Sequence, residues 1–374
     1  MKVLHVISGL GVGGAESMLS SVSLALHRQG IKQSVVCLTS GGKFAEQLRA
    51  SGISVTELGM RRGRPSLCRM LTLVFLIRSQ RPDVIQSWMY HADLLATLAL
   101  LLSGRRMQTL LCWGIRCSNL NFKEQRIILR SVVRICSLLS GIPDCIIANS
   151  QAGRNVHVVM GYRSSRIRVI ANGIDTIRYH PDPDARQKVR SLLGLNPDTP
   201  LIAHVARVDP MKDHQCFLDA LARLPSVAAI VVGSGTDMLP DRRGLYRFGC
   251  RSDVHRLLAA SDIIVSSSAY GEGFPTVVAE GMACGLPAVV TDVGDSARIV
   301  GDTGYVVASG NPQQLAQAIR LLLDETPDQR RIRSEHARRR IEEHYSLDSA
   351  VRAFLDVYRS GLLQEKPQHG SGVS

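Results

Sequence analysis

Two carboxylates, Glu272 and Glu280, stand eight residues apart in the segment 270–285. The glycines on either side of Glu272 permit a tight turn, Pro275 suits the first position of a helix, and Gly285 suits its end. We therefore expect Glu272 in a loop and Glu280 inside the helix that follows. The free N–H groups of a helix start bind anions, and a carboxylate further along can accept hydrogen bonds from two neighbouring hydroxyls. Phosphate plus ribose describes a nucleotide, although two ordinary acids on a surface helix would give the same spacing.

A pair of cations, Arg207 and Lys212, follows the apolar run 201–205. In the loop after a strand they could converge on one diphosphate, the guanidinium in a bidentate contact and the ammonium as a point charge. They could then stabilise a leaving group in place of a metal ion. We expect no metal, because the histidines and cysteines show no metal-ligand spacing and the D-x-D at Asp182 and Asp184 falls in a presumed linker. Ordinary surface charges are the alternative for both cations.

A glycine-rich stretch follows the first apolar run and contains G-x-G-x-x-G at Gly9, Gly11 and Gly14. A nicotinamide or flavin dinucleotide would also need an acidic residue at the end of the second strand. That strand ends in Cys37-Leu-Thr-Ser40, without a carboxylate. We therefore interpret the glycines as a loop that a phosphate or a sugar approaches closely. A dinucleotide site, or a turn that only packs a helix on a strand, stays an alternative.

Apolar runs of strand length alternate with helix-length segments along most of the chain. This alternation is typical of parallel sheets with helices on both faces. The runs expected to form strands are 3–7, 34–38, 53–57, 84–87, 109–112, 145–149 and 167–170, then 201–205, 229–232, 246–248, 263–266, 287–291 and 304–307. The segment between Gly235 and Tyr246 is so short that we expect a shortened or missing crossover helix there. The expected fold class is α/β, with two doubly wound domains.

The chain has 374 residues, 45% of them hydrophobic, and is long enough for two cores. The turn at Asn172–Asp175 and the prolines after it separate the two series of strands. We expect an N-terminal domain over 1–173 and a C-terminal domain over 174–350. A C-terminal helix with a disordered tail is expected over 351–374.

Neither a secretory leader nor a membrane span is expected. Met1 and Lys2 lead directly into a strand-like run, and the longest apolar run, Leu94–Leu102, is about half as long as a bilayer span. The nine cysteines are scattered without C-x-x-C pairs, as is typical of reduced thiols. We therefore expect a cytoplasmic protein.

The net charge of +13 belongs to the N-terminal half. Residues 1–175 contain 22 Lys and Arg against 8 Asp and Glu, whereas the remainder contains 23 against 24. Such asymmetry indicates nucleic acid, an anionic membrane surface or an anionic substrate as a partner. Nucleic acid is disfavoured, because aromatic residues make up only 5% of the chain and no recognition module is legible.

Two groups of arginines lie beside apolar segments. One group recurs every fourth residue on an expected amphipathic helix, and the other precedes the apolar run 71–77. The first consists of Arg126, Arg130 and Arg134, and the second of Arg61, Arg62, Arg64 and Arg69. Together they could seat the N-terminal domain on an anionic membrane. A solvated helix face over an ordinary core is the alternative.

Taken together, these motifs resemble the retaining glycosyltransferases of family 4. The resemblance spans about residues 1–360 and is carried by Gly13-Gly-Ala-Glu16, Asn172-Gly-Ile-Asp175, Arg207 with Lys212, Gly233-Ser-Gly235, and Glu272 with Glu280. It implies the GT-B architecture, in which two Rossmann-like domains face each other across a cleft and a C-terminal helix returns to the N-terminal domain. The segments Ser87–His91 and Trp113–Arg116 are most similar to members that build bacterial surface polysaccharides.

The resemblance also implies roles for single residues. Catalytic roles fall to Arg207 and Lys212, which would bind the donor diphosphate, and to Glu272, which would orient the transferred sugar. His91 would lie near that sugar, and Glu280 would hold the ribose of the nucleotide. The remaining donor-binding positions are Gly14, Gly233, Phe248, Gly273, Phe274 and Thr276.

The implied function is that of a metal-independent hexosyltransferase that retains the configuration of the sugar. It would move a hexose from a UDP- or GDP-sugar, without a further cofactor, to a saccharide acceptor that we expect to be lipid-linked. The expected context is surface polysaccharide biosynthesis, such as that of lipopolysaccharide O-antigen or exopolysaccharide, on the inner face of the cell membrane. The alternatives are a nucleotide-sugar hydrolase or epimerase of the same fold, an NAD-dependent oxidoreductase and a catalytically idle nucleotide-sugar-binding subunit.

Overall fold

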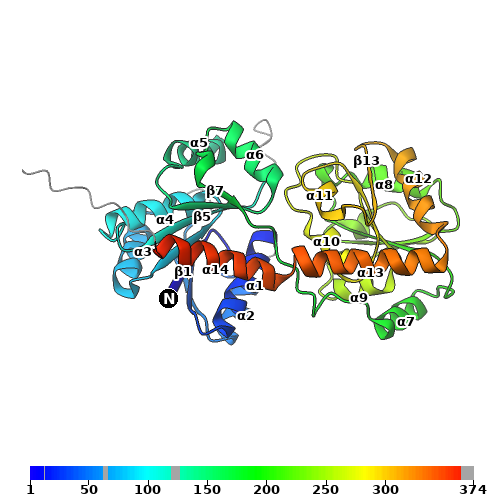
Figure 1. The fold of residues 1–374 in the computed structure, drawn as a ribbon, viewed down its shortest axis with the longest axis horizontal. Coiled ribbons are helices and arrows are strands. Elements are labelled where there is room, and N and C mark those ends of the chain that lie inside the picture. Colours follow the sequence, from blue (N-terminus) through cyan, green and yellow to red (C-terminus); the bar gives the residue numbers. More distant parts are fainter. Residues whose placement is uncertain (12, 62–65, 119–126, 364–374) are drawn as a thin grey trace, which may run out of the picture.

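The structure of the protein, a computed structural model, describes residues 1–11, 13–61, 66–118 and 127–363. The chain forms two α/β domains that lie side by side along the long axis of the molecule (Figure 1). Three residues of the two arginine groups, Arg62, Arg64 and Arg126, lie outside the described residues. The tail expected at the C-terminus also lies outside them from residue 364 on.

The N-terminal domain is built on a parallel sheet with the strand order β3-β2-β1-β4-β5-β6-β7. Its central strands are buried on both faces, as is usual for a parallel sheet that helices cover from both sides. The strands are β1 (Lys2–Ile7), β2 (Lys32–Cys37), β3 (Ser54–Glu57), β4 (Val84–Trp88), β5 (Leu110–Ile115), β6 (Cys145–Ala148) and β7 (Ile167–Val169). The helices are α1 (Gly14–Arg28), α2 (Lys43–Ala50), α3 (Leu67–Gln80), α4 (Tyr90–Leu102), α5 (Ile127–Leu139), α6 (Gln151–Val159) and the 3-10 turn η1 (Ser164–Arg166).

The C-terminal domain repeats this plan with a parallel sheet in the order β10-β9-β8-β11-β12-β13. Its strands are β8 (Leu201–Val205), β9 (Ala228–Val232), β10 (Leu245–Arg247), β11 (Ile263–Ser266), β12 (Ala288–Thr291) and β13 (Tyr305–Val307). Its helices are α7 (Pro183–Leu192), α8 (His214–Leu221), α9 (Val254–Ala260), α10 (Thr276–Ala283), α11 (Ser296–Val300), α12 (Pro312–Leu323) and α13 (Pro327–His344), with 3-10 turns η2 (Pro210–Lys212) and η3 (Thr236–Met238).

All the strands expected from the sequence are present, with ends that differ by up to three residues. The expected short crossover is confirmed, because the connection from β9 to β10 contains only the single turn η3. Within the described ranges, no helix combines the length and the apolar character that crossing a bilayer requires.

The strand orders place one topological switch point in each domain. It lies between β1 and β4 in the N-terminal sheet and between β8 and β11 in the C-terminal sheet, where the direction of winding reverses. Ligands of open α/β sheets bind outside the carboxyl ends of the strands at such points. The loops after these strands are therefore where a site is expected in each domain.

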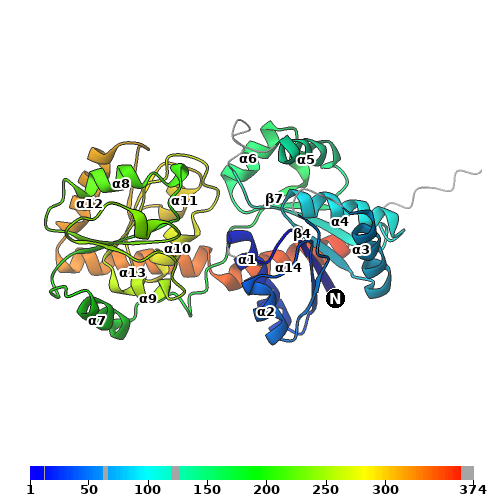
Figure 2. The same ribbon diagram turned by 180° about the vertical axis from the view of Figure 1, so that it is seen from behind.

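The last two helices join the domains, as the resemblance implied. Helix α13 begins with a capping box at Thr326 and packs on α10 of the C-terminal domain. Helix α14 (Leu347–Leu363) returns to the N-terminal domain and packs on α1, which both ribbon views show (Figures 1 and 2). There Phe354 and Tyr358 are fully buried, and Phe354 stacks on Trp88 at a ring distance of 6.0 Å. The confirmed GT-B architecture thus has a C-terminal helix in the core of its first domain.

Candidate functional site

The segment with the two spaced carboxylates is a loop followed by α10, as expected. Gly271 adopts a φ of 77°, which favours glycine, and Pro275 is the N-cap rather than the first residue of the helix. The helix ends at Ala283, and Gly285 then adopts a φ of 81°, a common way to terminate a helix. Glu272 therefore lies in the loop after β11, and Glu280 lies inside α10.

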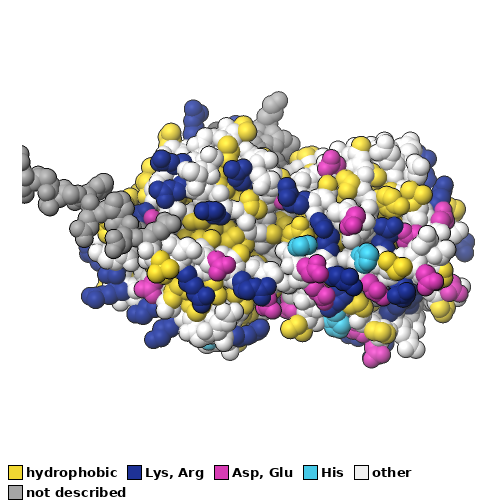
Figure 3. Space-filling model, viewed as in Figure 1, with side chains coloured by type: hydrophobic (Ala, Val, Ile, Leu, Met, Phe, Trp, Pro, Cys, Tyr) yellow, Lys and Arg dark blue, Asp and Glu magenta, His cyan; other side chains and the backbone are white. Residues whose placement is uncertain are grey.

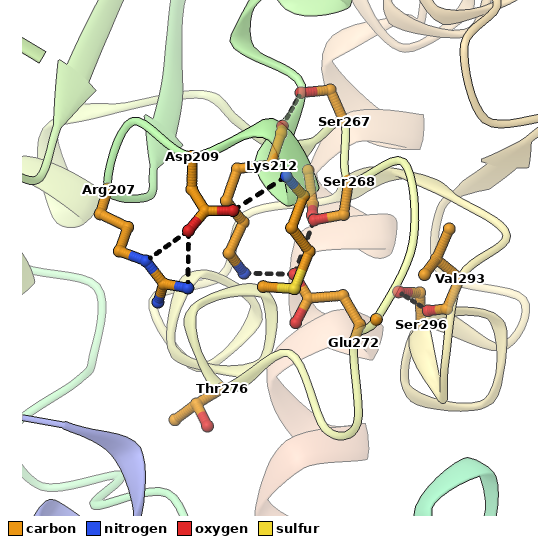
Figure 4. Close-up of polar contacts among 12 residues, drawn as sticks. Arg207, Asp209, Lys212, Ser267, Ser268, Glu272, Thr276, Val293 and Ser296 are labelled. Atoms are coloured by element: carbon orange, nitrogen blue, oxygen red, sulfur yellow. Dashed lines mark hydrogen bonds and ion pairs between the residues drawn. The ribbon is translucent and has the colours of Figure 1, made fainter. Parts of the chain in front are cut away.

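Glu272 is buried and held by two side chains of its own domain. It is 7% exposed. Ser268 Oγ donates a hydrogen bond of 2.6 Å to Glu272 Oε1, and Lys212 Nζ forms an ion pair with the same oxygen (Figure 4). A buried charge is costly without such partners. The carboxylate is thus fixed beside the lysine, and Ser268 is a positioning residue that no sequence motif indicated.

Lys212 is placed by a strained turn between β8 and α8. The turn η2 begins at Asp209, whose side chain accepts a backbone N–H at 2.9 Å, and it ends at Lys212. The next residue, Asp213, adopts a φ of 44°, in the left-handed region that residues with a Cβ rarely occupy. Such backbone strain clusters at functional sites. Its presence beside Lys212 is an independent indication that this loop is functional.

Two buried polar residues support the lysine turn. Ser267 Oγ donates to the carbonyl oxygens of Lys212 and Asp213, at 2.9 and 3.0 Å, and lies 3.0 Å from His204 Nε2. Burial holds the pKa of His204 well below its ordinary value, so its ring is neutral near pH 7. The strained turn is therefore fastened to the sheet by hydrogen bonds.

Arg207 lies on the same loop as Lys212, and 58% of its side chain is exposed. Its guanidinium contacts Asp209 Oδ2 at 3.0 Å through both Nε and Nη2. Figure 4 shows Arg207, Asp209 and Lys212 along this loop, with Glu272 next to the lysine. An exposed ion pair of this kind contributes about 0–1 kcal/mol. Arg207 can therefore turn from Asp209 toward a bound anion at little cost.

Glu280 lies within α10, and its carboxylate is a hydrogen-bond partner of Tyr179. Burial raises the pKa of Glu280 from 4.5 to about 7, and the hydrogen bond to Tyr179 and the charge of Arg178 oppose that rise. The Tyr179 ring also meets His255 edge-on at 6.4 Å. Tyr179 belongs to the linker between the domains, so sequence spacing gave no signal of its contact with Glu280.

In the N-terminal domain, the two predicted site residues follow the strands of the switch point. Gly14 is the first residue of α1, and a Cβ placed on it would have no described atom within 4 Å, so the described residues do not require glycine there. His91 is the second residue of α4, is partly buried, and has a pKa lowered by that burial. The residue before α4, Met89, has φ 73° and ψ 155°, a conformation that is almost restricted to glycine. Backbone strain therefore marks this loop too.

Three other predicted donor-binding residues have structural roles of their own. Gly233 has a φ of 143°, and a Cβ there would come within 2.2 Å of the carbonyl oxygen of Ala206. Phe274 is 6% exposed, and its ring packs against Tyr345 at 5.6 Å in the core of the C-terminal domain. Phe248 is partly buried, with the Arg251 guanidinium 5.6 Å from its ring. The Phe274 side chain therefore packs in the core of the C-terminal domain.

Contacts between the domains surround the Glu272 loop. Ser118 Oγ, beyond the end of β5, donates to the Gly271 carbonyl at 3.1 Å. Asp295, after β12, accepts the N–H groups of Gln151 and Ala152 at the start of α6, at 2.8 and 2.9 Å. These residues come from four separate loops, which is why the sequence gave no indication of them.

Close backbone approach explains two glycines of this region. A Cβ on Gly273 would lie 3.2 Å from Ser150 Oγ of the other domain. A Cβ on Gly294, whose φ is 65°, would lie 2.2 Å from the carbonyl oxygen of Glu272. The close approach of the loops after β11 and β12 therefore requires glycine at 294, whereas a side chain at 273 would require Ser150 to shift.

A cavity of about 350 Å³ lies at the hinge between the domains. Asn172 and Phe274 line it together with Asp295 and residues from the junction of α13 and α14. Arg207, Lys212 and Glu272 do not line it. The cavity is therefore separate from the charged site, by which we mean Arg207, Lys212 and Glu272.

Two other kinds of ligand, a metal ion and a dinucleotide, can be compared with the structure. Within the described ranges, no three His, Cys, Asp or Glu side chains lie close enough together to hold a metal ion. At the end of β2, Thr39 Oγ1 donates to the Ser8 carbonyl of the glycine-rich loop at 2.9 Å. Thr39 thus ties two loops together at the edge where a dinucleotide site would need a carboxylate.

Two family models match most of the chain. The model of Glycosyltransferase Family 4 matches residues 12–178, and the model of Glycosyl transferases group 1 matches residues 185–340. Among curated proteins, the D-inositol 3-phosphate glycosyltransferase of Mycobacterium marinum is 31% identical over 221 residues, which are 53% of this chain and 46% of that protein. The enzyme of the same name from Xylanimonas cellulosilytica is 31% identical over 238 residues, which are 58% and 56% of the two chains. The chain thus aligns with about half the length of these relatives.

Solved structures share the fold over nearly the whole chain. HepE from Anabaena, crystallised in complex with UDP, has a TM-score of 0.84 at 24% identity and covers 96% of this chain and 100% of its own. WaaG, a glycosyltransferase involved in lipopolysaccharide biosynthesis, has a TM-score of 0.70 at 15% identity, with 96% and 99% covered. At 24% and 15% identity, the structural similarity shows that this chain shares the GT-B architecture of these proteins.

Proposed function

Because the chain belongs to the family 4 and group 1 glycosyltransferases, we propose that it moves a hexose from a nucleoside diphosphate sugar to a saccharide acceptor, with retention of configuration. The two family models support glycosyl transfer as the type of reaction. The donor, the acceptor and the stereochemical course are our proposal, and the residues of the charged site support it.

The pairing of Lys212 with Glu272 carries the proposal. Both side chains are fixed by buried partners at the carboxyl ends of β8 and β11, beside the start of α10. A diphosphate bound there would take Glu272's place as the partner of Lys212 and would draw Arg207 from Asp209. The released Glu272 carboxylate would then accept hydrogen bonds from hydroxyls of the donor sugar. In this proposal, the ion pair keeps the Lys212 and Glu272 side chains in position until the donor binds.

The proposed reaction uses these groups to stabilise the departing diphosphate. The bond between the anomeric carbon and the phosphate oxygen breaks while the acceptor oxygen attacks from the same face. The acceptor's proton passes to the phosphate oxygen that leaves, so no protein base is needed for this step. Arg207, Lys212 and the N–H groups at the start of α10 would stabilise the negative charge that develops there.

We propose that the reaction needs no metal ion. The two cations of the loop after β8, Arg207 and Lys212, would neutralise the diphosphate in place of a metal ion. HepE was crystallised in complex with UDP and in complex with UDP-glucose. A UDP-sugar is therefore the first donor to test, with a GDP-sugar second.

For the acceptor, we propose an anionic, lipid-linked saccharide in surface polysaccharide biosynthesis. The excess of positive charge in residues 1–175 would attract a phosphate-bearing acceptor. The relatives at 31% identity are named for inositol 3-phosphate, which also carries a phosphate. WaaG is described as acting in lipopolysaccharide biosynthesis.

The outer helices of the N-terminal domain support peripheral seating on the cytoplasmic face of a membrane. On α3, Leu67 is 76% exposed and Phe75 is 67% exposed, and on α5, Leu138 is 82% exposed. Figure 3 shows Lys and Arg side chains spread over this domain with few acidic ones, whereas the C-terminal domain mixes both signs. Exposed apolar side chains among cations suit an anionic lipid surface.

The first test of the proposed function is a melting experiment with UDP, GDP, ADP and NAD, each with and without EDTA. A ligand at about 100 times its dissociation constant adds roughly 2.7 kcal/mol to the free energy of unfolding, which raises the melting temperature visibly. We expect UDP or GDP alone to stabilise the protein, with no effect of EDTA. Stabilisation by NAD alone would contradict the proposal.

A further inference from the structure

A chain of hydrogen bonds crosses from the N-terminal domain to the start of α10. Arg116 Nη1, at the end of β5, donates to Asn172 Oδ1 at 2.6 Å. Asn172 Nδ2 donates in turn to Thr276 Oγ1 at 3.0 Å. Asn172 is 6% exposed and belongs to the hinge, so the chain of bonds links both domains through one buried side chain.

The direction of these hydrogen bonds is fixed by their first member. A guanidinium can only donate, so the amide oxygen of Asn172 must face Arg116 and its NH₂ group must face Thr276. The hydroxyl oxygen of Thr276 therefore accepts a hydrogen bond from the amide. Its own proton must point to a different acceptor.

Arg116 has no freedom to reverse the arrangement. Its guanidinium lies 4.6 Å from the Trp88 ring centre and 5.7 Å from that of Phe354, both of which are fully buried. In the part of the chain that the structure describes, Nε and Nη2 of Arg116 are buried without a hydrogen-bond partner. Among the described residues, the Asn172 amide oxygen thus accepts the hydrogen bond that this guanidinium donates, and the amide cannot turn over without breaking it.

Thr276 is the end of the hydrogen-bonded series and the first residue of α10. The carbonyl oxygen of Phe274, 3.5 Å away, is the acceptor that its hydroxyl meets in the structure, and the distance is long for an O–H donor. In Figure 4, Thr276 lies below the loop that carries Arg207 and Lys212. A proton donor at a helix start is well suited to an anion, because the N–H groups there point the same way.

We infer that Asn172 is a positioning residue that turns the hydroxyl proton of Thr276 toward a phosphate oxygen of the donor. Arg116 sets the orientation of the Asn172 amide. The amide NH₂ group then donates a hydrogen bond to the Thr276 hydroxyl oxygen. The Thr276 hydroxyl is left to donate its own hydrogen bond to a phosphate oxygen of the nucleotide sugar. The inference rests on the proposed function, because it requires a diphosphate at the start of α10. It also makes donor binding sensitive to the hinge, since Asn172 reaches Thr276 from the segment that joins the domains.

The test is a double-mutant cycle read by calorimetric titration with UDP, or with GDP if only GDP stabilises the wild type. The variants are Asn172→Asp, Thr276→Val and the double variant, with Thr276→Ser as the conservative replacement. The carboxylate that Asn172→Asp introduces would keep the contact to Arg116, yet it would accept a hydrogen bond from the Thr276 hydroxyl instead of donating one to it. Asn155→Asp, on the exposed face of α6, is the matched control for the added charge.

We expect Asn172→Asp and Thr276→Val each to weaken binding roughly tenfold or more, as the loss of a hydrogen bond to a charged group does. Thr276→Ser and Asn155→Asp should bind like the wild type. The double variant should bind the nucleotide within a factor of about three of the weaker-binding single variant. The reason is that both changes remove the same contact, the hydrogen bond from Thr276 to the phosphate.

The outcomes separate the two proposals. If the loss of affinity in the double variant equals the product of the two single losses, Asn172 and Thr276 act independently and the role of Asn172 is overturned. Wild-type affinity in Thr276→Val would overturn that role as well. Both results would leave the proposed function intact. A wild type that binds neither UDP nor GDP would overturn both. If Asn172→Asp does not fold, the comparison of Thr276→Val with Thr276→Ser still decides, since equal affinity of these two variants would overturn the inference.

Discussion

In the N-terminal domain the strands beside the switch point, β1 and β4, lead to Gly14 and His91, whereas in the C-terminal domain β8 and β11 lead to Lys212 and Glu272. The same edge of the same fold thus carries different groups. The C-terminal domain presents a cation and an anion that buried partners hold in place. The N-terminal domain presents glycine, one histidine ring and backbone.

The charges of the two domains are arranged differently as well. The C-terminal part of the chain is nearly neutral, and its paired charges meet at the Lys212–Glu272 site. The N-terminal part carries the excess of Lys and Arg, which Figure 3 shows spread over its surface. A few fixed charges suit the stabilisation of one transition state, whereas a spread of exposed charges suits attraction of an anionic surface or substrate. We therefore propose donor chemistry for the C-terminal domain and acceptor recognition for the N-terminal domain.

The largest effect should come from removing the fixed cation of the C-terminal domain. Lys212→Ala should lower the turnover of the donor roughly 10²- to 10³-fold, because one preorganised charge at the departing phosphate is lost. The measurement is the release of UDP from the donor. Lys188→Ala, an exposed change on α7, is the control and should be as active as the wild type. Near-native turnover in Lys212→Ala would contradict the assignment of donor chemistry to the C-terminal domain.

The Glu280 carboxylate of α10 should make stability depend on pH. Because burial raises the pKa of Glu280 from 4.5 to about 7, the folded chain keeps a proton that the unfolded chain has lost. The free energy of unfolding should therefore fall as the pH rises from about 4.5 to 7 and change no further above that range. Glu280→Gln should remove this fall, which is at most about 3 kcal/mol.

Urea denaturation between pH 4 and pH 8 measures this effect. The curve for Glu280→Gln should lie increasingly above that of the wild type as the pH rises. Glu46→Gln, an exposed change on α2, should run parallel to the wild type. A parallel curve for Glu280→Gln would show that the carboxyl titrates normally.

A smaller effect is expected from the side chain that orients Glu272. Ser268→Ala removes the 2.6 Å hydrogen bond to Glu272 Oε1 and should lower kcat about tenfold, with little change in the affinity for UDP. Steady-state kinetics and a UDP titration together check this. Ser191→Ala on α7 is the matched control. An equal loss of UDP affinity would indicate that Ser268 acts on the nucleotide and not on the sugar.

The smallest effect is expected at the surface of the N-terminal domain. Arg134→Ala on α5 should weaken co-sedimentation with anionic vesicles about fivefold at low salt, since each basic residue near such a surface is worth about 1 kcal/mol. Arg339→Ala on α13 is the control in the other domain. Equal weakening by both variants would mean that the N-terminal domain has no special surface.

The regular parts of the fold could be predicted from the sequence. Each strand is recognisable as a short apolar run, because strands of a parallel sheet are buried on both faces and so cannot alternate with polar residues. The short crossover after Gly235 was visible from the number of residues alone, and η3 occupies it. Single ends, such as that of β5, moved by up to three residues because propensity does not fix where a strand leaves the sheet.

The candidate site could be predicted only in part. Charged residues after strands, such as Lys212 and Glu272, are visible because their type and their distance from a motif are local properties. Ser268, Tyr179 and Asp295 were not visible, since each acts on a partner that the fold brings near from elsewhere. The buried side chain of Phe274 was also hidden, because the sequence does not say which face of a loop points inward.

The most direct test of the comparison is a calorimetric titration with UDP, or with GDP if only GDP stabilises the wild type, in the presence of EDTA. It uses three proteins, the wild type, Lys212→Ala and Arg134→Ala. We expect equal affinity for the wild type and Arg134→Ala, and at least roughly tenfold weaker binding by Lys212→Ala, where a charged contact is lost. Wild-type affinity in Lys212→Ala would contradict the assignment of donor chemistry to the C-terminal domain.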